Sequence, residues 1–141
     1  MKAMHQSDLP EEWATLVKAA QSARARAYAP YSQFAVGAAV RDRDGRIYTG
    51  SNVENASYGL TVCAERVAIW NAVASGQRAF SALVVASETG AMPCGACRQV
   101  LAEFAPEMPV VVVDGLGHAW MTSVNELLPS AFTPAQLSSE E

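Results

Sequence analysis

All three cysteines of the chain lie in two short segments, Cys63-Ala64-Glu65 and Pro93-Cys94-Gly95-Ala96-Cys97. Each segment begins a run of apolar residues at helical spacing, so the pattern predicts cysteines at the starts of two helices. A Cys-x-x-Cys pair in this position can direct both sulfurs to one metal ion, and Gly95 permits the tight turn that this requires. A fold that places all three sulfurs on one metal must therefore bring the two helix N-termini together.

Zinc suits such a set of thiolates. Protein-bound zinc is usually tetrahedral, so three cysteine ligands leave one position open, which is typical of a catalytic rather than a structural site. Water in that position is acidified toward a pKa of about 7. Two alternatives stay open. A redox pair fits poorly with a third cysteine beside a glutamate, and a structural zinc needs a further ligand from His5 or His118.

The charge of such a site needs compensation. Three thiolates on a divalent cation leave a negative site, which opposes ionisation of the bound water. The positive ends of the two helices, Arg66 and Arg98 can each offset that charge, and we favour Arg66 as a donor to thiolate sulfur. Glu65 follows Cys63 by two residues, so its side chain can turn toward the water without binding the metal. The alternative for Glu65 is a first-turn glutamate that only favours the helix dipole.

The rest of the pattern alternates between strands and helices. The expected helices span 10–29, 63–74, 95–104 and 124–128, and the expected strands span 34–40, 47–53, 82–86, 110–113 and 119–122. Asp44-Gly45 is a hairpin signal between the first two strands. Gly37, in a small apolar strand, indicates that another element approaches closely there. This order predicts an α/β fold with a mixed sheet covered by helices on both faces.

Length and charge narrow the classes of function. The chain has 141 residues and a net charge of −4, which favours one domain and gives no electrostatic reason to expect a nucleic-acid partner. Its apolar runs are too short for a membrane helix, and its N-terminus lacks a signal-peptide core. We expect a cytoplasmic domain over 1–141, with a loose leader at 1–9 and a loose tail at 133–141. A reducing compartment would keep the cysteines as thiols.

Five segments resemble the cytidine/deoxycytidylate deaminase superfamily, and more narrowly its small homotetrameric cytidine deaminases with a three-cysteine zinc site. These segments are 28–39, 52–58, 63–66, 93–100 and 126–132. The resemblance implies a three-layer α-β-α sandwich with a mixed, roughly five-stranded sheet. It also implies one zinc ion per subunit and a homotetramer whose sites are completed by neighbouring subunits.

The resemblance further implies a reaction and the residues that perform it. Cytidine and 2′-deoxycytidine are hydrolysed to the uridine forms and ammonia, as in pyrimidine salvage. Zinc hydroxide attacks C4, and Glu65 carries protons to N3 and to the leaving amine. The implied zinc ligands are Cys63, Cys94 and Cys97. The implied substrate-binding residues are Phe34, Asn52, Glu54, Tyr58, the main chain of Ala64, and Phe132 from a neighbouring subunit.

The residues themselves support some of these roles. Asn52 and Glu54 share one face of a strand, and an amide with a carboxylate suits sugar hydroxyls. Taken alone, Phe34 is an ordinary core phenylalanine, Tyr58 a loop tyrosine and Phe132 a C-terminal apolar anchor.

Two departures and three rival functions accompany the resemblance. The stretch Ser87–Met92 is short for the family and lies beside the zinc segment, and Val67 replaces a common threonine. The rivals are a deaminase of another aminopyrimidine such as blasticidin, a polynucleotide editor and a non-catalytic zinc-stabilised module. The Asn52-Val53-Glu54-Asn55 pattern favours ribose over the antibiotic, and the absence of a basic surface disfavours a polynucleotide.

Overall fold

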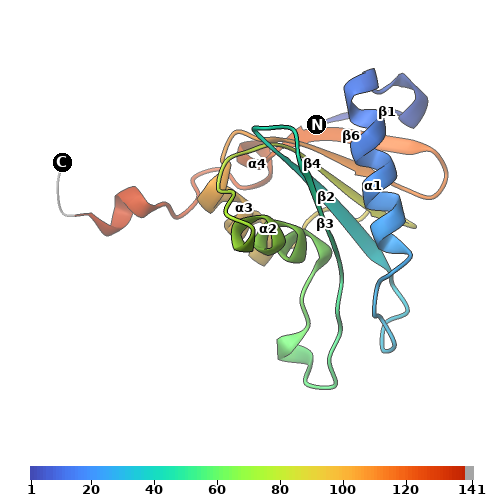
Figure 1. Cartoon of the computed structure of the whole chain (residues 1–141), viewed down its shortest axis with the longest axis horizontal. Coiled ribbons are helices and arrows are strands. Elements are labelled where there is room, and N and C mark those ends of the chain that lie inside the picture. Colours follow the sequence, from blue (N-terminus) through green and yellow to red (C-terminus); the bar gives the residue numbers. More distant parts are fainter. Residues whose placement is uncertain (139–141) are drawn as a thin grey trace.

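A six-stranded mixed sheet runs through the middle of the computed structural model, which describes residues 1–138 (Figure 1). The strand order is β1-β6-β5-β4-β2-β3. Strands β4 and β5 pair in parallel, and the other neighbours pair antiparallel. The strands are β1 (Lys2–His5), β2 (Val36–Asp42), β3 (Ile47–Ser51), β4 (Phe80–Ser87), β5 (Pro109–Val113) and β6 (His118–Ser123).

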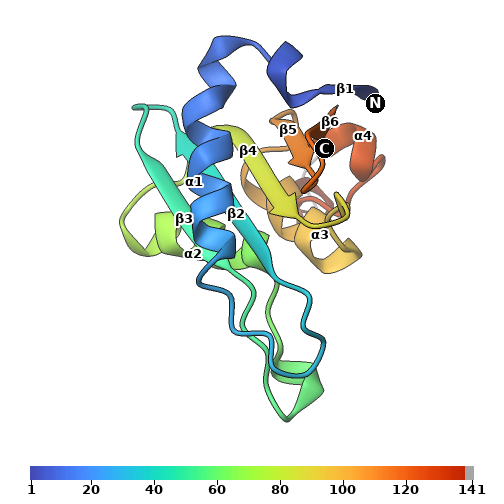
Figure 2. The same cartoon turned by 90° about the vertical axis from the view of Figure 1, so that its right-hand side faces the viewer.

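Helices cover both faces of this sheet (Figures 1 and 2). Helix α1 (Ala14–Arg24) packs its buried residues on one face. Helices α2 (Ala64–Ala74), α3 (Gly95–Phe104) and α4 (Val124–Leu127) pack on the other. The sheet therefore separates two hydrophobic clusters, and its central strands are buried on both sides. The α/β fold with a mixed sheet and helices on both faces is confirmed.

Two glycines let the helices approach the sheet closely. A Cβ atom on Gly37 would lie 2.1 Å from the main-chain oxygen of Ala20 in α1. A Cβ atom on Gly50 would lie 2.4 Å from the main-chain nitrogen of Ala68 in α2. Backbone cannot move aside as a flexible side chain can, so both positions exclude larger residues. The expectation of a close approach at Gly37 is confirmed.

The N-terminal segment differs from the expected loose leader. Residues Lys2–His5 form β1 and pair with β6, with Lys2 opposite Met121 and His5 opposite His118. Single-turn 3₁₀ helices follow at Gln6–Asp8 and Glu11–Trp13. The sheet thus has six strands, where about five were expected. The additional strand was missed because pairing of the backbone with an edge strand requires no strong sequence pattern in a short segment.

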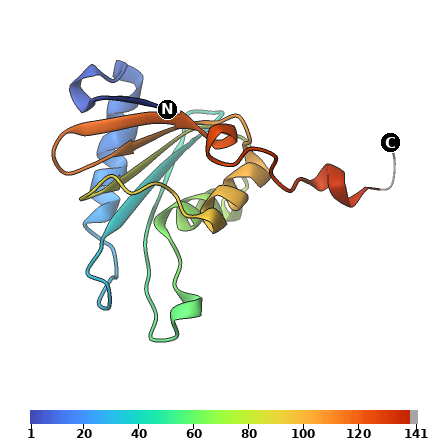
Figure 3. The same cartoon turned by 180° about the vertical axis from the view of Figure 1, so that it is seen from behind.

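The C-terminal segment also carries some local structure. Pro134–Leu137 forms a 3₁₀ turn in a segment that leaves the body of the protein (Figure 3). The last part of the expected loose tail, 139–141, lies outside the described residues. Within 1–138, no helix has the length and apolarity needed to cross a membrane.

Two irregular segments project beyond the sheet on the same side (Figures 1 and 2). One connects α1 to β2, and the other connects β3 to α2. An isolated parallel bridge between Tyr28 and Val53 joins them, and an antiparallel bridge between Val53 and Val62 closes the second segment on itself. The second segment ends at Cys63, so its pairing with the first helps to set the start of α2.

Candidate metal centre and substrate cavity

The three cysteine sulfurs meet in space. Cys94 Sγ lies 3.7 Å from Cys63 Sγ and 3.5 Å from Cys97 Sγ, and all three ligand atoms lie within 4.8 Å of one another. Tetrahedral zinc with Zn–S bonds near 2.3 Å would place its sulfurs about 3.8 Å apart. The observed spacing therefore fits zinc, and the convergence of the two helix starts is as predicted.

The helix starts explain why the sulfurs converge. Cys63 and Cys94 are the N-cap residues of α2 and α3, both with extended backbone, and Cys97 lies in the first turn of α3. The two helices pack on the same face of the sheet. Their N-terminal ends carry partial positive charge, which stabilises thiolates placed there.

Arg66 lies against the first ligand. Its Nη2 atom donates to Cys63 Sγ across 3.5 Å, and its guanidinium carbon lies 5.9 Å from the centre of the Trp70 ring. Hydrogen bonding with Cys97 and then with Arg66 lowers the pKa of the Cys63 thiol to about 5. This geometry is what a donor to thiolate sulfur requires.

Arg98, the other cation that could offset thiolate charge, bonds to main-chain carbonyls instead. Its Nε atom donates to the carbonyl oxygen of Pro93 at 2.7 Å, and its Nη1 atom donates to the carbonyl oxygen of Leu127 at 2.8 Å. The guanidinium is committed to main-chain carbonyls. Its position one residue after Cys97 gave no sign of this, because one acceptor, the Leu127 carbonyl, lies 29 residues away and the other is set by how the chain enters α3.

Glu65 is a buried carboxyl beside the ligands. Its side chain is only 4% exposed. Burial is the largest cause that raises the pKa of this carboxyl to about 7, and the charge of Cys63 adds to the effect. A carboxyl with such a pKa can both accept and donate a proton near neutral pH.

A cavity of about 260 Å³ opens beside this centre. It is lined by Phe34, Asn52, Glu54, Cys63, Ala64, Glu65 and Cys94, together with Ser32, Val36, Thr61, Val62, Val85, Ala91 and Met92. The structure thus brings together most of the residues singled out in the sequence. An apolar lining with a few convergent polar groups is typical of a small-molecule site.

Asn52 and Glu54 also hold the cavity wall that carries Phe34. Asn52 Oδ1 accepts from the Val36 N–H at 2.9 Å, and Asn52 Nδ2 donates to the Phe34 carbonyl at 2.8 Å. Glu54 Oε1 accepts from the main-chain N–H groups of Tyr31 and Ser32, at 2.9 and 3.0 Å. Glu54 Oε2 accepts from the Ser32 hydroxyl. These bonds order the turn at Gln33, whose φ of 58° is left-handed.

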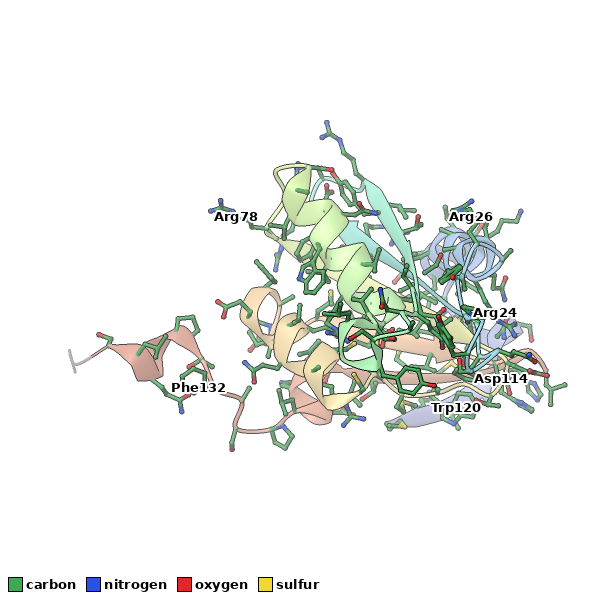
Figure 4. All side chains as sticks on the ribbon, turned by 90° about the horizontal axis from the view of Figure 1, so that it is seen from below. Arg24, Arg26, Arg78, Asp114, Trp120 and Phe132 are labelled. Atoms are coloured by element: carbon green, nitrogen blue, oxygen red, sulfur yellow. The ribbon has the colours of Figure 1, made fainter. Side chains whose placement is uncertain are left out.

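Tyr58 and Phe132 lie outside the cavity. Tyr58 is 75% exposed, contacts Tyr31 edge-on and lines a neighbouring hollow with Ser32, Glu54 and Thr61. Phe132 is 57% exposed on the C-terminal segment, away from the body (Figure 4). Its carbonyl accepts from Gln99 Nε2 at 2.8 Å. Phe132 therefore does not close the cavity of its own chain, and it is not a buried anchor.

The segment Ser87–Met92 forms another wall. The Ser87 hydroxyl accepts from the N–H groups of Gly90 and Ala91, at 3.1 and 3.0 Å. Gly90 has a φ of +73° and packs on the Trp120 ring, so a Cβ atom there would lie 2.5 Å from Trp120 Cζ3. Ala91 and Met92 then line the cavity. Sequence reasoning missed Ser87, Gly90 and Trp120, and the only local signal was a serine shortly before a glycine in a turn.

Comparison with known proteins agrees with this site. The family model described as "Cytidine and deoxycytidylate deaminase zinc-binding region" matches residues 10–113, which include all three cysteines. A cytidine deaminase of Sporosarcina psychrophila is 48% identical over 126 residues, covering 87% of this chain and 93% of the relative. A blasticidin-S deaminase of Bacillus cereus is 33% identical over 108 residues, covering 70% of this chain and 76% of the relative.

A solved structure shows the same architecture. The cytidine deaminase of Burkholderia pseudomallei superposes with a TM-score of 0.83 at 48% identity, covering 88% of this chain and 100% of that chain. The metal of Cys63, Cys94 and Cys97 is zinc, since these residues lie in the zinc-binding region of the matching family and their sulfurs have the spacing it needs. The chain belongs to the cytidine and deoxycytidylate deaminase family.

Proposed function

We propose that this chain is a zinc-dependent cytidine deaminase that hydrolyses cytidine and 2′-deoxycytidine to uridine and 2′-deoxyuridine. Water supplies the oxygen at C4, the bond from C4 to the exocyclic nitrogen breaks, and ammonia leaves. The observation that carries the proposal is the meeting of the zinc centre, buried Glu65 and the Asn52–Glu54 pair at one cavity. Relatives named as cytidine deaminases at 48% identity support it.

The zinc ion and the side chains of the protein have separate roles in the reaction. Zinc, when bound, acidifies a coordinated water and so supplies a nucleophile near neutral pH. Glu65 lines the same cavity. Its carboxylate takes one proton from the water and delivers it to pyrimidine N3, then takes the remaining proton of that oxygen and delivers it to the leaving amine. Ala64 is the first residue of α2, so its N–H has no partner within the helix and is available to the base.

Asn52 and Glu54 keep capacity for a ribose. A carboxylate has about four acceptor positions and an amide has two donor hydrogens and two lone pairs. Glu54 uses three positions on the 31–32 turn, and Asn52 uses one hydrogen and one lone pair. Both residues can therefore shape the wall that carries Phe34 and still bind sugar hydroxyls, while Phe34 packs against the pyrimidine.

We also propose that the protein is a homotetramer in which Phe132 of a neighbouring subunit completes a site, with Tyr58 in the hollow beside the cavity contributing to substrate binding. The exposure of Phe132 on a segment that leaves the body (Figure 4) supports insertion into a neighbouring copy. Sedimentation of the whole chain, and of a chain ending at Ala131, tests this. A tetramer whose truncated form loses activity supports it, whereas a fully active truncated monomer contradicts it.

The remaining expectations concern the extent of the domain, its compartment and its substrates. Residues 1–141 are proposed to be one cytidine deaminase-like domain, and three cysteines that form no disulfide suit a reducing cytoplasm. Free nucleosides are the proposed substrates, as in pyrimidine salvage. The likeness to a blasticidin-S deaminase favours that antibiotic as the second candidate substrate.

One assay decides among these substrates. The purified zinc protein is given cytidine, 2′-deoxycytidine, cytosine or blasticidin S, and the loss of the aminopyrimidine absorbance is followed with zinc content measured on the same sample. We expect turnover of both nucleosides and little of cytosine, which lacks the ribose that Asn52 and Glu54 would bind. Zinc-loaded protein that turns over neither nucleoside would contradict the proposal.

A further inference from the structure

Cys94 is the zinc ligand with the least support from packing. Cys97 is fully buried within α3, and Cys63 has Arg66 as a hydrogen-bond partner. Cys94 is exposed, and it follows a segment without regular structure. A Cβ atom on the next residue, Gly95, would meet nothing within 4 Å. The position of this ligand therefore depends on main-chain contacts near it.

Arg98 supplies such contacts. Its bond to the Pro93 carbonyl, at 2.7 Å, holds the peptide group that leads directly into Cys94. Its bond to the Leu127 carbonyl, at 2.8 Å, ties the same guanidinium to the last residue of α4. Carbonyls at the end of a helix have no partner within that helix, so Arg98 also satisfies one of them. Both bonds are partly buried.

We propose that Arg98 is a positioning residue for the zinc site. It ties the Pro93–Cys94 peptide to the end of α4, and so holds the Cys94 sulfur beside those of Cys63 and Cys97. This role depends on the ability of one guanidinium to donate to two carbonyls at once, not on its positive charge. An ammonium group carries the same charge but cannot reproduce a planar fork with two donors fixed in direction. The proposal concerns metal retention and does not depend on which substrate is turned over.

The test compares Arg98→Met, which removes donors and charge, with Arg98→Lys, which keeps the charge. Zinc-loaded proteins are mixed with a chromophoric chelator, and the rate of zinc release is measured. Loss of a group that orients a ligand costs roughly 10- to 100-fold in metal affinity, so we expect both variants to release zinc roughly 10-fold faster or more. Cobalt-substituted samples should show shifted ligand-field bands in both variants, because the Cys94 sulfur is displaced.

Arg78→Met is the matched control. Arg78 is exposed and projects from the surface near the end of α2 remote from the cysteines (Figure 4). Its variant should match the original protein in zinc release and cobalt spectrum.

The proposal holds if the lysine variant releases zinc at a rate closer to that of Arg98→Met than to that of the original protein, and is overturned otherwise. If Arg98→Met does not fold, the lysine variant decides alone: release as slow as the original overturns the proposal, and faster release supports it.

Discussion

Arg66 Nη2 donates to Cys63 Sγ across 3.5 Å, within the first turn of α2. Residues three apart share a helix face, so the pairing is built into the local structure. Arg66 is the cation whose contacts suit it to balance the negative charge of a zinc ion with three thiolates. It therefore differs from Arg98, which bonds to main-chain carbonyls.

Replacement of Arg66 by alanine should weaken zinc retention. Without the donor to Cys63, we expect zinc release to a chelator to accelerate roughly 10-fold, the lower part of the range for groups that hold ligands. The activity–pH profile should also move to higher pH, because an uncompensated anionic site disfavours ionisation of the zinc water. Exposed Arg78→Ala is the control. Unchanged zinc release and an unchanged profile would remove Arg66 from this role.

Glu65→Gln should separate chemistry from folding. The carboxyl is buried, and glutamine has nearly its shape, so the fold and the zinc content should survive. Loss of a general acid–base costs about 10²- to 10⁴-fold in rate, and we expect kcat to fall by at least that much. Thermal unfolding and zinc analysis accompany the rate measurement. A variant with nearly full kcat would refute proton transfer by Glu65.

Glu54 should contribute to stability in a pH-dependent way. The Ser32 hydroxyl, followed by the Ser32 N–H, lowers the pKa of this carboxyl. A carboxylate whose pKa is lower in the folded state than its unfolded value of about 4.3 stabilises the fold above that pH, and the contribution is lost as the pH falls through the folded pKa. We therefore expect Glu54→Gln to lower the urea midpoint at pH 7, with the difference shrinking at pH values below the ordinary glutamate range.

Exposed Glu103→Gln on α3 is the control for this series, and it should leave the urea midpoint nearly unchanged at pH 7. A difference between Glu54→Gln and the original protein that stays constant from pH 7 down to acid pH would show that the stabilisation does not come from the ionised carboxylate.

Gly90→Ala should disturb the cavity wall as well as stability. The residue has a φ of +73°, and its Cβ atom would lie 2.5 Å from Trp120 Cζ3. A left-handed non-glycine residue costs about 1–2 kcal/mol, and overpacking adds about 1–3 kcal/mol. Because Ala91 and Met92 line the cavity, we also expect KM for cytidine to rise.

Gly117→Ala is the matched control, since Gly117 has a φ of +91° but open space around its Cβ position. Gly117→Ala should lower the free energy of unfolding only by the about 1–2 kcal/mol of the left-handed backbone, and it should leave KM unchanged. Adding Trp120→Leu to Gly90→Ala should recover part of the lost stability, because the clash is with the indole ring. Equal losses for the two glycine variants, with equal KM values, would mean that the Trp120 contact has no consequence.

The sequence by itself determined most of the elements and the metal. Helices and strands follow from spacing within short windows, and the predicted helices at 63–74 and 95–104 match α2 and α3 closely. Gly37 signalled a close approach for a similarly local reason, because only glycine lacks a Cβ atom. The three cysteines predicted zinc because the donor type limits the metals that can bind.

Tertiary structure decided which distant groups meet. Strand β1 forms from a segment with little pattern because the edge of β6 offers partners. Arg98 reaches two carbonyls that lie far apart in sequence, and Asn52 and Glu54 brace the turn before Phe34. A side chain's hydrogen-bond partner is set by which backbone lies beside it after packing, and neither residue type nor spacing records that. The cysteine segments could predict a zinc site, but only the folded chain showed that Arg66 lies against Cys63 and that Arg98 bonds the carbonyl just before Cys94.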